Sequence, residues 1–181
     1  VGVPNLANFL VSITSLAIWL VWPLFLKNVW EYSTLGVGLG VTVGPIAAGT
    51  STVVFSRLGD RVGRVALCRL GAAIQVFAVA WHFTRLGTEV NYWLDFAPGP
   101  ILFGLGWGMS TPLLNSIALA AVDERYFGET NGLFNTLRYA AAAVGTAAVF
   151  ALLKEDAGEA ALRYYDRTLF FFICASVAGF L

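Results

Sequence analysis

The sequence predicts an all-helical membrane protein in which residues 1–181 form a single transmembrane domain of six helices. Two observations carry this prediction. The chain is 58% hydrophobic and only 12% charged, whereas soluble domains carry about 25% charged residues. Its apolar residues also gather in long runs, and about twenty apolar residues are what an α-helix needs to cross the hydrocarbon core of a bilayer.

The first three runs cover residues 6–26, 35–55 and 65–83. The first lacks the basic start and the small-residue cleavage site of a signal peptide, so we expect it to be a mature span. The second is uncharged and rich in glycine. The third contains Arg69 and Gln75 but is otherwise apolar enough to span.

The last three runs cover residues 96–122, 133–153 and 168–181. The fourth is uncharged and contains three prolines, and the fifth contains Arg138. The sixth is too short for a full span, so we expect a truncated last helix. Because the chain also begins with Val1 rather than Met, we interpret it as a piece of a longer protein.

The connection between the second and third runs is short and basic. It reads SRLGDRVGR from Ser56 to Arg64 and carries Arg57, Arg61 and Arg64 against Asp60. A dense cluster of arginines in a short loop is typical of the cytoplasmic side of a membrane. We therefore expect this loop, and with it both chain ends, to be cytoplasmic.

Small residues and prolines recur at helical spacing in the second, fourth and fifth runs. Glycines four residues apart share one helix face and let a neighbouring backbone approach closely, whereas prolines favour kinks. The pattern fits static packing as well as helices that bend or slide during a change of state. The residues concerned are Gly40, Gly44, Pro45, Gly104, Gly108, Pro112 and Gly145.

Arg138 is the most costly residue to place in a membrane. Translocon scales give an arginine at the centre of a span about +2.5 to +3.5 kcal/mol. Arg138 either faces a cavity or gate, together with Asn131 and Asn135 on the same helix face, or extends to the cytoplasmic surface. Gln75 and Asn115 are further candidates to line that interior.

The sequence contains no recognisable catalytic or metal-binding set, so we expect neither an enzyme nor a cofactor. Its only histidine, His82, lies at a run end, where we expect a solvated residue. A formal net charge of zero gives no support for a nucleic-acid partner. Aromatic residues near the run ends favour anchoring at the membrane interface; they are Trp22, Trp30, Tyr32, Trp81, Tyr92 and Trp93.

Two stretches resemble the major facilitator superfamily. The loop 56–64 is similar to the superfamily signature G-R-L-A-D-R-x-G-R-R, with Ser56 and Gly59 at its first and fourth positions and Val65 at its last. Residues 101–149, with an N-x-x-R-x-x-G-like stretch that begins at Asn135, resemble the tenth and eleventh helices of the fourteen-helix drug:proton antiporter branch. At the first glycine of that stretch the chain has Ala141.

The resemblance implies the carboxy-terminal half of such a carrier, built from two inverted three-helix repeats, with the amino-terminal half absent. It implies a gating role for Arg57, Asp60, Arg61, Gly63 and Arg64. The implied function is proton-coupled efflux of hydrophobic or cationic small molecules across the plasma membrane, and the implied phenotype is multidrug resistance. The alternative is a membrane protein that does not transport, either a remnant or a scaffold.

Overall fold

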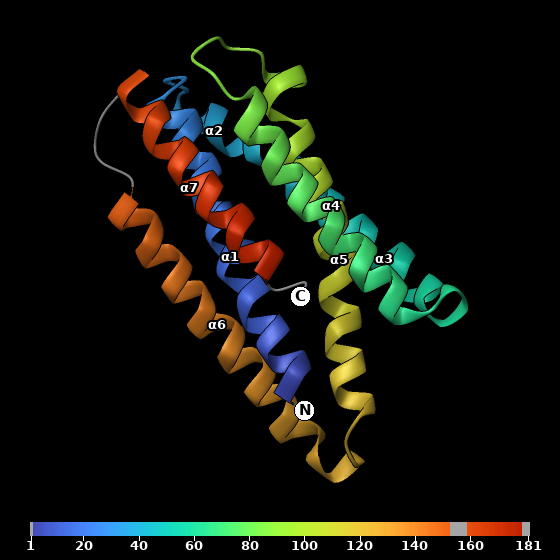
Figure 1. The fold of residues 1–181 in the computed structure, drawn as a ribbon. Coiled ribbons are helices and arrows are strands. Elements are labelled where there is room, and N and C mark those ends of the chain that lie inside the picture. Colours follow the sequence, from blue (N-terminus) through green and yellow to red (C-terminus); the bar gives the residue numbers. More distant parts are fainter. Residues whose placement is uncertain (1, 153–158, 179–181) are drawn as a thin grey trace.

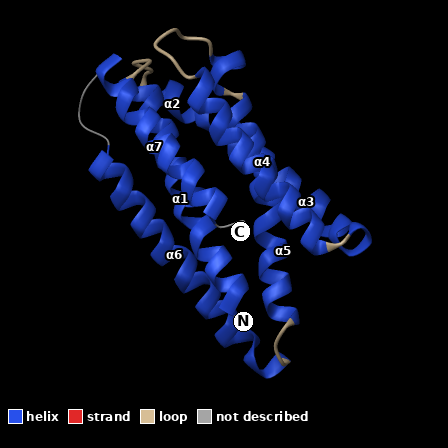
Figure 2. Ribbon diagram, in the orientation of Figure 1, coloured by secondary structure: helices blue, strands red, loops and turns tan. Residues whose placement is uncertain are grey.

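The computed structural model describes residues 2–152 and 159–178, and within these ranges the chain is helical with no strand (Figures 1 and 2). These described residues form six long helices, one of which is interrupted. Two short helical turns, of π and 3₁₀ type, lie in the connections at Tyr92–Phe96 and Glu124–Tyr126. The long helices are α1 (Gly2–Asn28), α2 with α3 (Thr34–Val41 and Val43–Val62), α4 (Arg64–Arg85), α5 (Pro98–Ala120), α6 (Phe127–Leu152) and α7 (Glu159–Ala178).

The long helices pack in two groups of three, and each helix runs opposite to its counterpart in the other group (Figure 1). Helix α1 packs mainly against α6 and α7, and α5 packs in the same way against α3 and α4. If the first three long helices are exchanged in order with the last three, α1 takes the place of α5. The contacts of α1 with α6 and α7 then correspond to those of α5 with α3 and α4. In Figure 1, α1 and α6 run upward whereas α3 and α5 run downward. This is the arrangement of two inverted three-helix repeats.

The second long helix is interrupted at Thr42, between α2 and α3, and the cause lies at Pro45. Proline has no backbone N–H to donate to Val41, four residues earlier, and its ring crowds that carbonyl. The backbone N–H of Thr42 bonds instead to the carbonyl of Leu39 at 3.3 Å. The Thr42 hydroxyl also donates to the carbonyl of Gly38 at 2.7 Å. The interruption lies next to Pro45, one of the two predicted kink points; the other, Pro112, lies inside α5, which the structure assigns as one helix.

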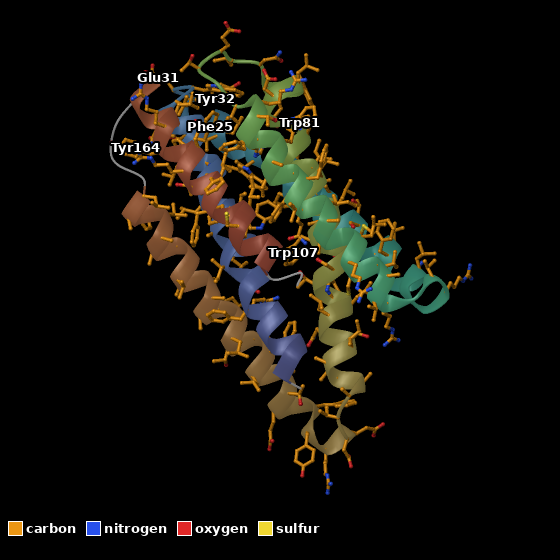
Figure 3. The ribbon with its side chains drawn as sticks, viewed as in Figure 1. Phe25, Glu31, Tyr32, Trp81, Trp107 and Tyr164 are labelled. Carbon is orange, nitrogen blue, oxygen red and sulfur yellow. The ribbon has the colours of Figure 1, made fainter. Side chains whose placement is uncertain are left out.

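Aromatic side chains fill the core at the end of the bundle where α1 meets α2. Phe25 is fully buried there, with ring centroids 5.3 Å from Tyr165 and 6.3 Å from Phe96. Trp22 lies edge-on to Phe103 at 5.5 Å. Figure 3 shows Phe25 near the α1–α2 turn and Trp107 further along the bundle. Helices α1, α5 and α7 are thus joined through one aromatic cluster.

Two expected boundaries were wrong. The segment 56–62 is the last part of α3 rather than a loop, and Gly63 alone separates α3 from α4. Helix α7 begins at Glu159 rather than at Thr168, because its charged residues lie within the helix instead of ending it. The other helices begin and end within six residues of the predicted runs, apart from the end of the interrupted helix at Val62.

By length and composition alone, two helical segments of the described chain could cross a membrane. These are Thr34–Gly59, with mean hydropathy 1.5, and Arg64–Arg85, with the same mean hydropathy. Together they form the hairpin that carries the arginine cluster.

Candidate functional site

The basic hairpin is fixed to α5 by two contacts. Arg64 Nη1 donates a hydrogen bond of 2.7 Å to the hydroxyl of Ser116. At Gly59 the helices approach so closely that a Cβ would lie 2.8 Å from the side chain of Leu113. Gly63 has φ +103°, a conformation that favours glycine. The turn therefore consists of Gly63 alone, and the hairpin is held against α5 on both sides of it.

The arginines at the end of α3 do not share this contact. Arg57 and Arg61 are exposed, as is Gly63. The side chain of Asp60, which the signature resemblance places at the centre of the gate, lies outside the described residues. The structure therefore brings Arg64 into contact with α5 and leaves Arg57 and Arg61 on the surface.

Asn131, Asn135 and Arg138 follow one another along α6, as their spacing predicts. Asn135 Nδ2 donates to the backbone oxygen of Asn131 at 2.9 Å and to its Oδ1 at 3.1 Å. Arg138 Nη2 donates to the hydroxyl of Tyr139 at 3.3 Å, and its guanidinium lies 5.1 Å from the centroid of that ring. Arg138 is thus held by its own neighbour on α6.

Arg138 and Asn115 each carry a buried polar atom that the described chain leaves unsatisfied. The Nε of Arg138 and the Oδ1 of Asn115 have no hydrogen-bond partner within residues 2–152 and 159–178. Both side chains are half-buried, on α6 and α5. Burying a polar group without a partner costs about 1–3 kcal/mol. The Nε of Arg138 can therefore donate, and the Oδ1 of Asn115 can accept, a hydrogen bond from a group that is not among the described residues.

Gln75 lies apart from the α6 residues, in the core between α1, α4 and α5, and is only 4% exposed. The hydroxyl of Ser15 on α1 donates to its Oε1 at 3.1 Å. Its Nε2 donates to the hydroxyl of Ser110 on α5 at 2.9 Å, and that hydroxyl donates to the carbonyl of Gly106 at 2.9 Å. The amide thus bridges α1 and α5 through α4.

The glycines singled out from the sequence lie where helices cross. A Cβ at Gly104 would overlap the carbonyl oxygen of Gly44, and one at Gly108 would overlap that of Ala48, so α5 contacts the backbone of α3. At Gly145 a Cβ would overlap the carbonyl oxygen of Ile13 on α1. Gly40 faces Leu26 and Tyr92. Close backbone approach of this kind is the basis of small-residue helix packing in membranes.

An aromatic groove lies at the end of the bundle that carries the α1–α2 turn. The Tyr92 hydroxyl donates to the carbonyl of Gly40 at 2.7 Å, which fixes that ring at the edge of the groove. Burial raises the pKa of Tyr92. The groove has a volume of about 420 Å³ and is lined by Tyr32, Gly36, Leu39, Gly40, Val43, Tyr92 and Trp93.

Sequence reasoning misplaced the residues at this end of the bundle. His82, expected to be solvated, has no exposed surface, and Trp22 and Trp30, expected at the membrane interface, are 1% and 6% exposed. Trp93, by contrast, is 73% exposed, as an interfacial residue would be. Cys68, Gln75 and His82 are seven residues apart, a spacing that places all three on one face of α4. That spacing was the available signal of a buried polar stripe.

Comparison with known proteins gives one family and one relative. The family model of the Major Facilitator Superfamily matches residues 4–146, more than half of the chain. An uncharacterized MFS-type transporter of Bacillus subtilis (strain 168), YvkA, is 26% identical over 145 residues, which cover 80% of this chain and 32% of that protein. The chain thus spans about a third of the length of the curated relative it matches.

Proposed function

This chain belongs to the Major Facilitator Superfamily, and on that premise we propose that it forms the carboxy-terminal half of a secondary active transporter. The proposed activity is export of hydrophobic or cationic small molecules in exchange for protons. The observation that carries the proposal is the family match to residues 4–146 on a chain whose helices form two inverted groups of three. Inverted repeats that rock against one another are a common design of secondary transporters.

Arg138 is the residue that we assign to the transport pathway. It follows Phe134 by four residues and precedes Ala141 by three, so it shares the α6 face on which both are buried. A charge within a membrane span costs free energy, and lipid provides no partner that would offset this cost. The unsatisfied Nε supports a role in which a substrate or the amino-terminal half supplies the missing partner. Asn131, Asn135 and Asn115 are its proposed neighbours in the pathway, and Gln75 supports the helices behind it.

The basic hairpin is the proposed gate. Arg64 already ties α4 to α5 through Ser116, so a movement of α5 changes the position of the hairpin. We assign the interactions of the gate with the amino-terminal half to Asp60, Arg57 and Arg61. A charge-assisted hydrogen bond of about 1.5–3 kcal/mol, made in one state only, would shift the equilibrium between two states by roughly one to two powers of ten.

The surroundings of the chain follow from the same proposal. As a member of this superfamily it is an integral membrane protein. We place it in the plasma membrane, with the Arg57–Arg64 hairpin and both chain ends on the cytoplasmic side, because short arginine-rich connections stay in the cytoplasm. Its proposed partners are a small-molecule substrate, protons, the lipid bilayer and the amino-terminal half of the carrier.

Transport by the full-length protein in proteoliposomes tests the proposal. With an imposed proton gradient, we expect efflux of a fluorescent lipophilic cation. Arg138→Ala should lower the rate and change the apparent affinity, because it removes a charge from the pathway. Arg138→Lys should restore little if the planar guanidinium is required. Asp60→Asn should lower the rate without changing the affinity, because it acts on the gate.

The matched control is Arg69→Ala, since Arg69 is exposed on α4 and lies outside the proposed pathway. Its efflux should equal that of the wild type. Unchanged affinity in Arg138→Ala would reduce Arg138 to a surface anchor. Failure of the wild-type protein to move any of a panel of cations would favour the remnant or scaffold alternative.

A further inference from the structure

His82 is enclosed by three elements near the end of α4. Its ring has no exposed surface. The Nε1 of Trp22 on α1 lies 3.0 Å from Nδ1, and Nε2 lies 2.9 Å from the carbonyl oxygen of Phe96 at the end of the π-helical turn. The Phe96 ring stacks on the imidazole at 5.5 Å, and Trp22 lies edge-on at 5.8 Å.

The two partners determine the tautomer of the imidazole. An indole N–H only donates, so Nδ1 must accept with its lone pair. A backbone carbonyl only accepts, so Nε2 must carry the hydrogen. The ring is therefore a neutral imidazole protonated at Nε2, with both nitrogens engaged.

Helix α5 closes the site at Gly99. A Cβ at that position would overlap the imidazole ring, so only glycine allows this approach of α5 to α4. The imidazole thus cannot turn to present Nδ1 to another acceptor or donor while α1, α4 and α5 keep their present arrangement. Any change at Nδ1 has to be accompanied by movement of Trp22.

We propose that Nδ1 of His82 is a proton-binding site, and that a proton and the indole of Trp22 compete for it. One lone pair cannot hold both. When a proton from water binds Nδ1, the ring becomes an imidazolium that keeps its Nε2–H bond to Phe96, and the Trp22 N–H is released. Proton uptake by His82 and detachment of Trp22 from α4 are then coupled: conditions that favour one favour the other.

Among the described residues, the groups that bond to the ring, stack on it or closely approach it carry no charge: they are the indole of Trp22, the carbonyl and ring of Phe96, and the backbone of Gly99. The competition is therefore between a proton and a neutral donor, with no carboxylate in contact to hold an imidazolium. The elements that pack around His82 carry charged and titratable side chains at this end of the bundle, with the exception of α5, which has none. They are Lys27 on α1, Arg85 on α4, Tyr92 and Asp95 on the π-helical turn, and Arg163, Tyr164, Tyr165, Asp166 and Arg167 on α7.

The site gives this half of the molecule its own response to protons. Thr14, Ser15 and Trp22 give α1 hydrogen bonds to α7 and α4, and the bond of Trp22 is the one that a proton can displace. Detachment at Trp22 would loosen α1 from α4 at one end while Ser15 and Gln75 still join them further along. The inference concerns the bundle itself and does not depend on the proposed transport.

Nitrogen-15 NMR of histidine- and tryptophan-labelled protein in lipid nanodiscs tests the proposal. The chain has one histidine, and the His82→Gln variant assigns its signals. At neutral pH we expect a neutral ring protonated at Nε2. Between about pH 8 and about pH 3, a range that allows for the disfavoured charge on a buried ring, we expect protonation of Nδ1 together with a shift of the Trp22 indole signal at the same midpoint.

The Trp22→Phe variant separates proton competition from a merely structural contact. Without the indole, Nδ1 has no competitor, so the midpoint should rise by about half to one pH unit. Trp93→Phe, which removes an exposed indole, should leave the midpoint unchanged. A neutral ring protonated at Nδ1, a wild-type ring that does not titrate in this range, or an unchanged midpoint in Trp22→Phe would each overturn the proposal. The wild-type measurement decides the first two outcomes without any variant.

Discussion

The contacts of α5 with α3 and α4 differ in kind from those of α1 at the aromatic end of the bundle. Helix α5 presents Gly104 and Gly108 to α3 and Gly106 to α4, and a Cβ at any of them would overlap a backbone oxygen. Helix α1 instead places Trp22 and Phe25 among other rings. The first set joins backbones directly, whereas the second joins large side chains.

The difference determines what each region tolerates. Backbone oxygens in neighbouring helices cannot move aside without moving the whole helix, so contacts through glycine permit sliding but not added volume. Aromatic side chains can turn or shift, and indole and imidazole carry polar groups whose bonds can be exchanged. The α3–α4–α5 region is therefore suited to a fixed helix spacing, and the aromatic region to a change of partners.

The largest expected effect comes from adding volume where α5 meets α4. In Gly106→Leu the new side chain would overlap the carbonyl oxygen of Gly71 and approach Gln75. Overpacking usually costs about 1–3 kcal/mol, and here we expect the upper end or more because the obstacle is backbone. Unfolding in mixed detergent micelles, followed by tryptophan fluorescence, measures the loss. Gly49→Leu is the control because nothing lies within 4 Å of a Cβ there, and equal losses in both variants would refute the comparison.

A smaller effect is expected from removing an aromatic ring. Phe25→Ala leaves a cavity between α1, the π-helical turn and α7, where Phe25 contacts Phe96 and Tyr165. A cavity of this kind costs about 3–5 kcal/mol in soluble cores. We expect about 2–3 kcal/mol here, because lipid replaces water outside the bundle. The same unfolding assay applies, with Phe170→Ala as the control because Phe170 is 59% exposed. A loss greater than that of Gly106→Leu would reverse the order of the two regions.

The sequence was sufficient to predict the helices, and it indicated where small residues recur. The apolar runs are local signals, and the helices agree with them. Glycines four residues apart and Pro45 are local signals too, and they agree with the approach of Gly104 to α3 and with the interruption at Thr42. The hairpin was misjudged because charged residues were taken to end a helix. In the structure α3 continues to Val62, and only the positive φ of Gly63 ends it.

Burial at the aromatic end could not be predicted from local signals. His82 is buried because Trp22, sixty residues earlier, donates to it and because Gly99 leaves room for its ring. Neither partner is indicated by the residues around His82. For the candidate pathway, the spacing of Asn131 and Asn135 on α6 predicted that they lie close together. The bond of Arg138 to Tyr139 was not foreseen, since adjacent side chains point in different directions on an ideal helix.

The smallest expected effect concerns Gln75, which joins the two regions compared above. Its amide accepts from Ser15 on α1 and donates to Ser110 on α5. Gln75→Leu removes both bonds but fills much of the same space, and Ser110 keeps its bond to the carbonyl of Gly106. Since hydrogen bonds between membrane helices contribute about 0.6–1.7 kcal/mol each, we expect a loss of about 1–2 kcal/mol in the unfolding assay.

A double-mutant cycle with Ser15→Ala assigns that loss to the link between α1 and α4. If the link is real, Ser15→Ala should cost measurably less in the Gln75→Leu background than in the wild type. Ser56→Ala is the control, because Ser56 is exposed and bonds to Val53 of its own helix. Additive losses would mean that the bond between Ser15 and Gln75 contributes little to joining α1 and α4. In that case the bond of Trp22 to His82 would carry more of the polar contact between these helices, and the response of α1 to protons should be larger.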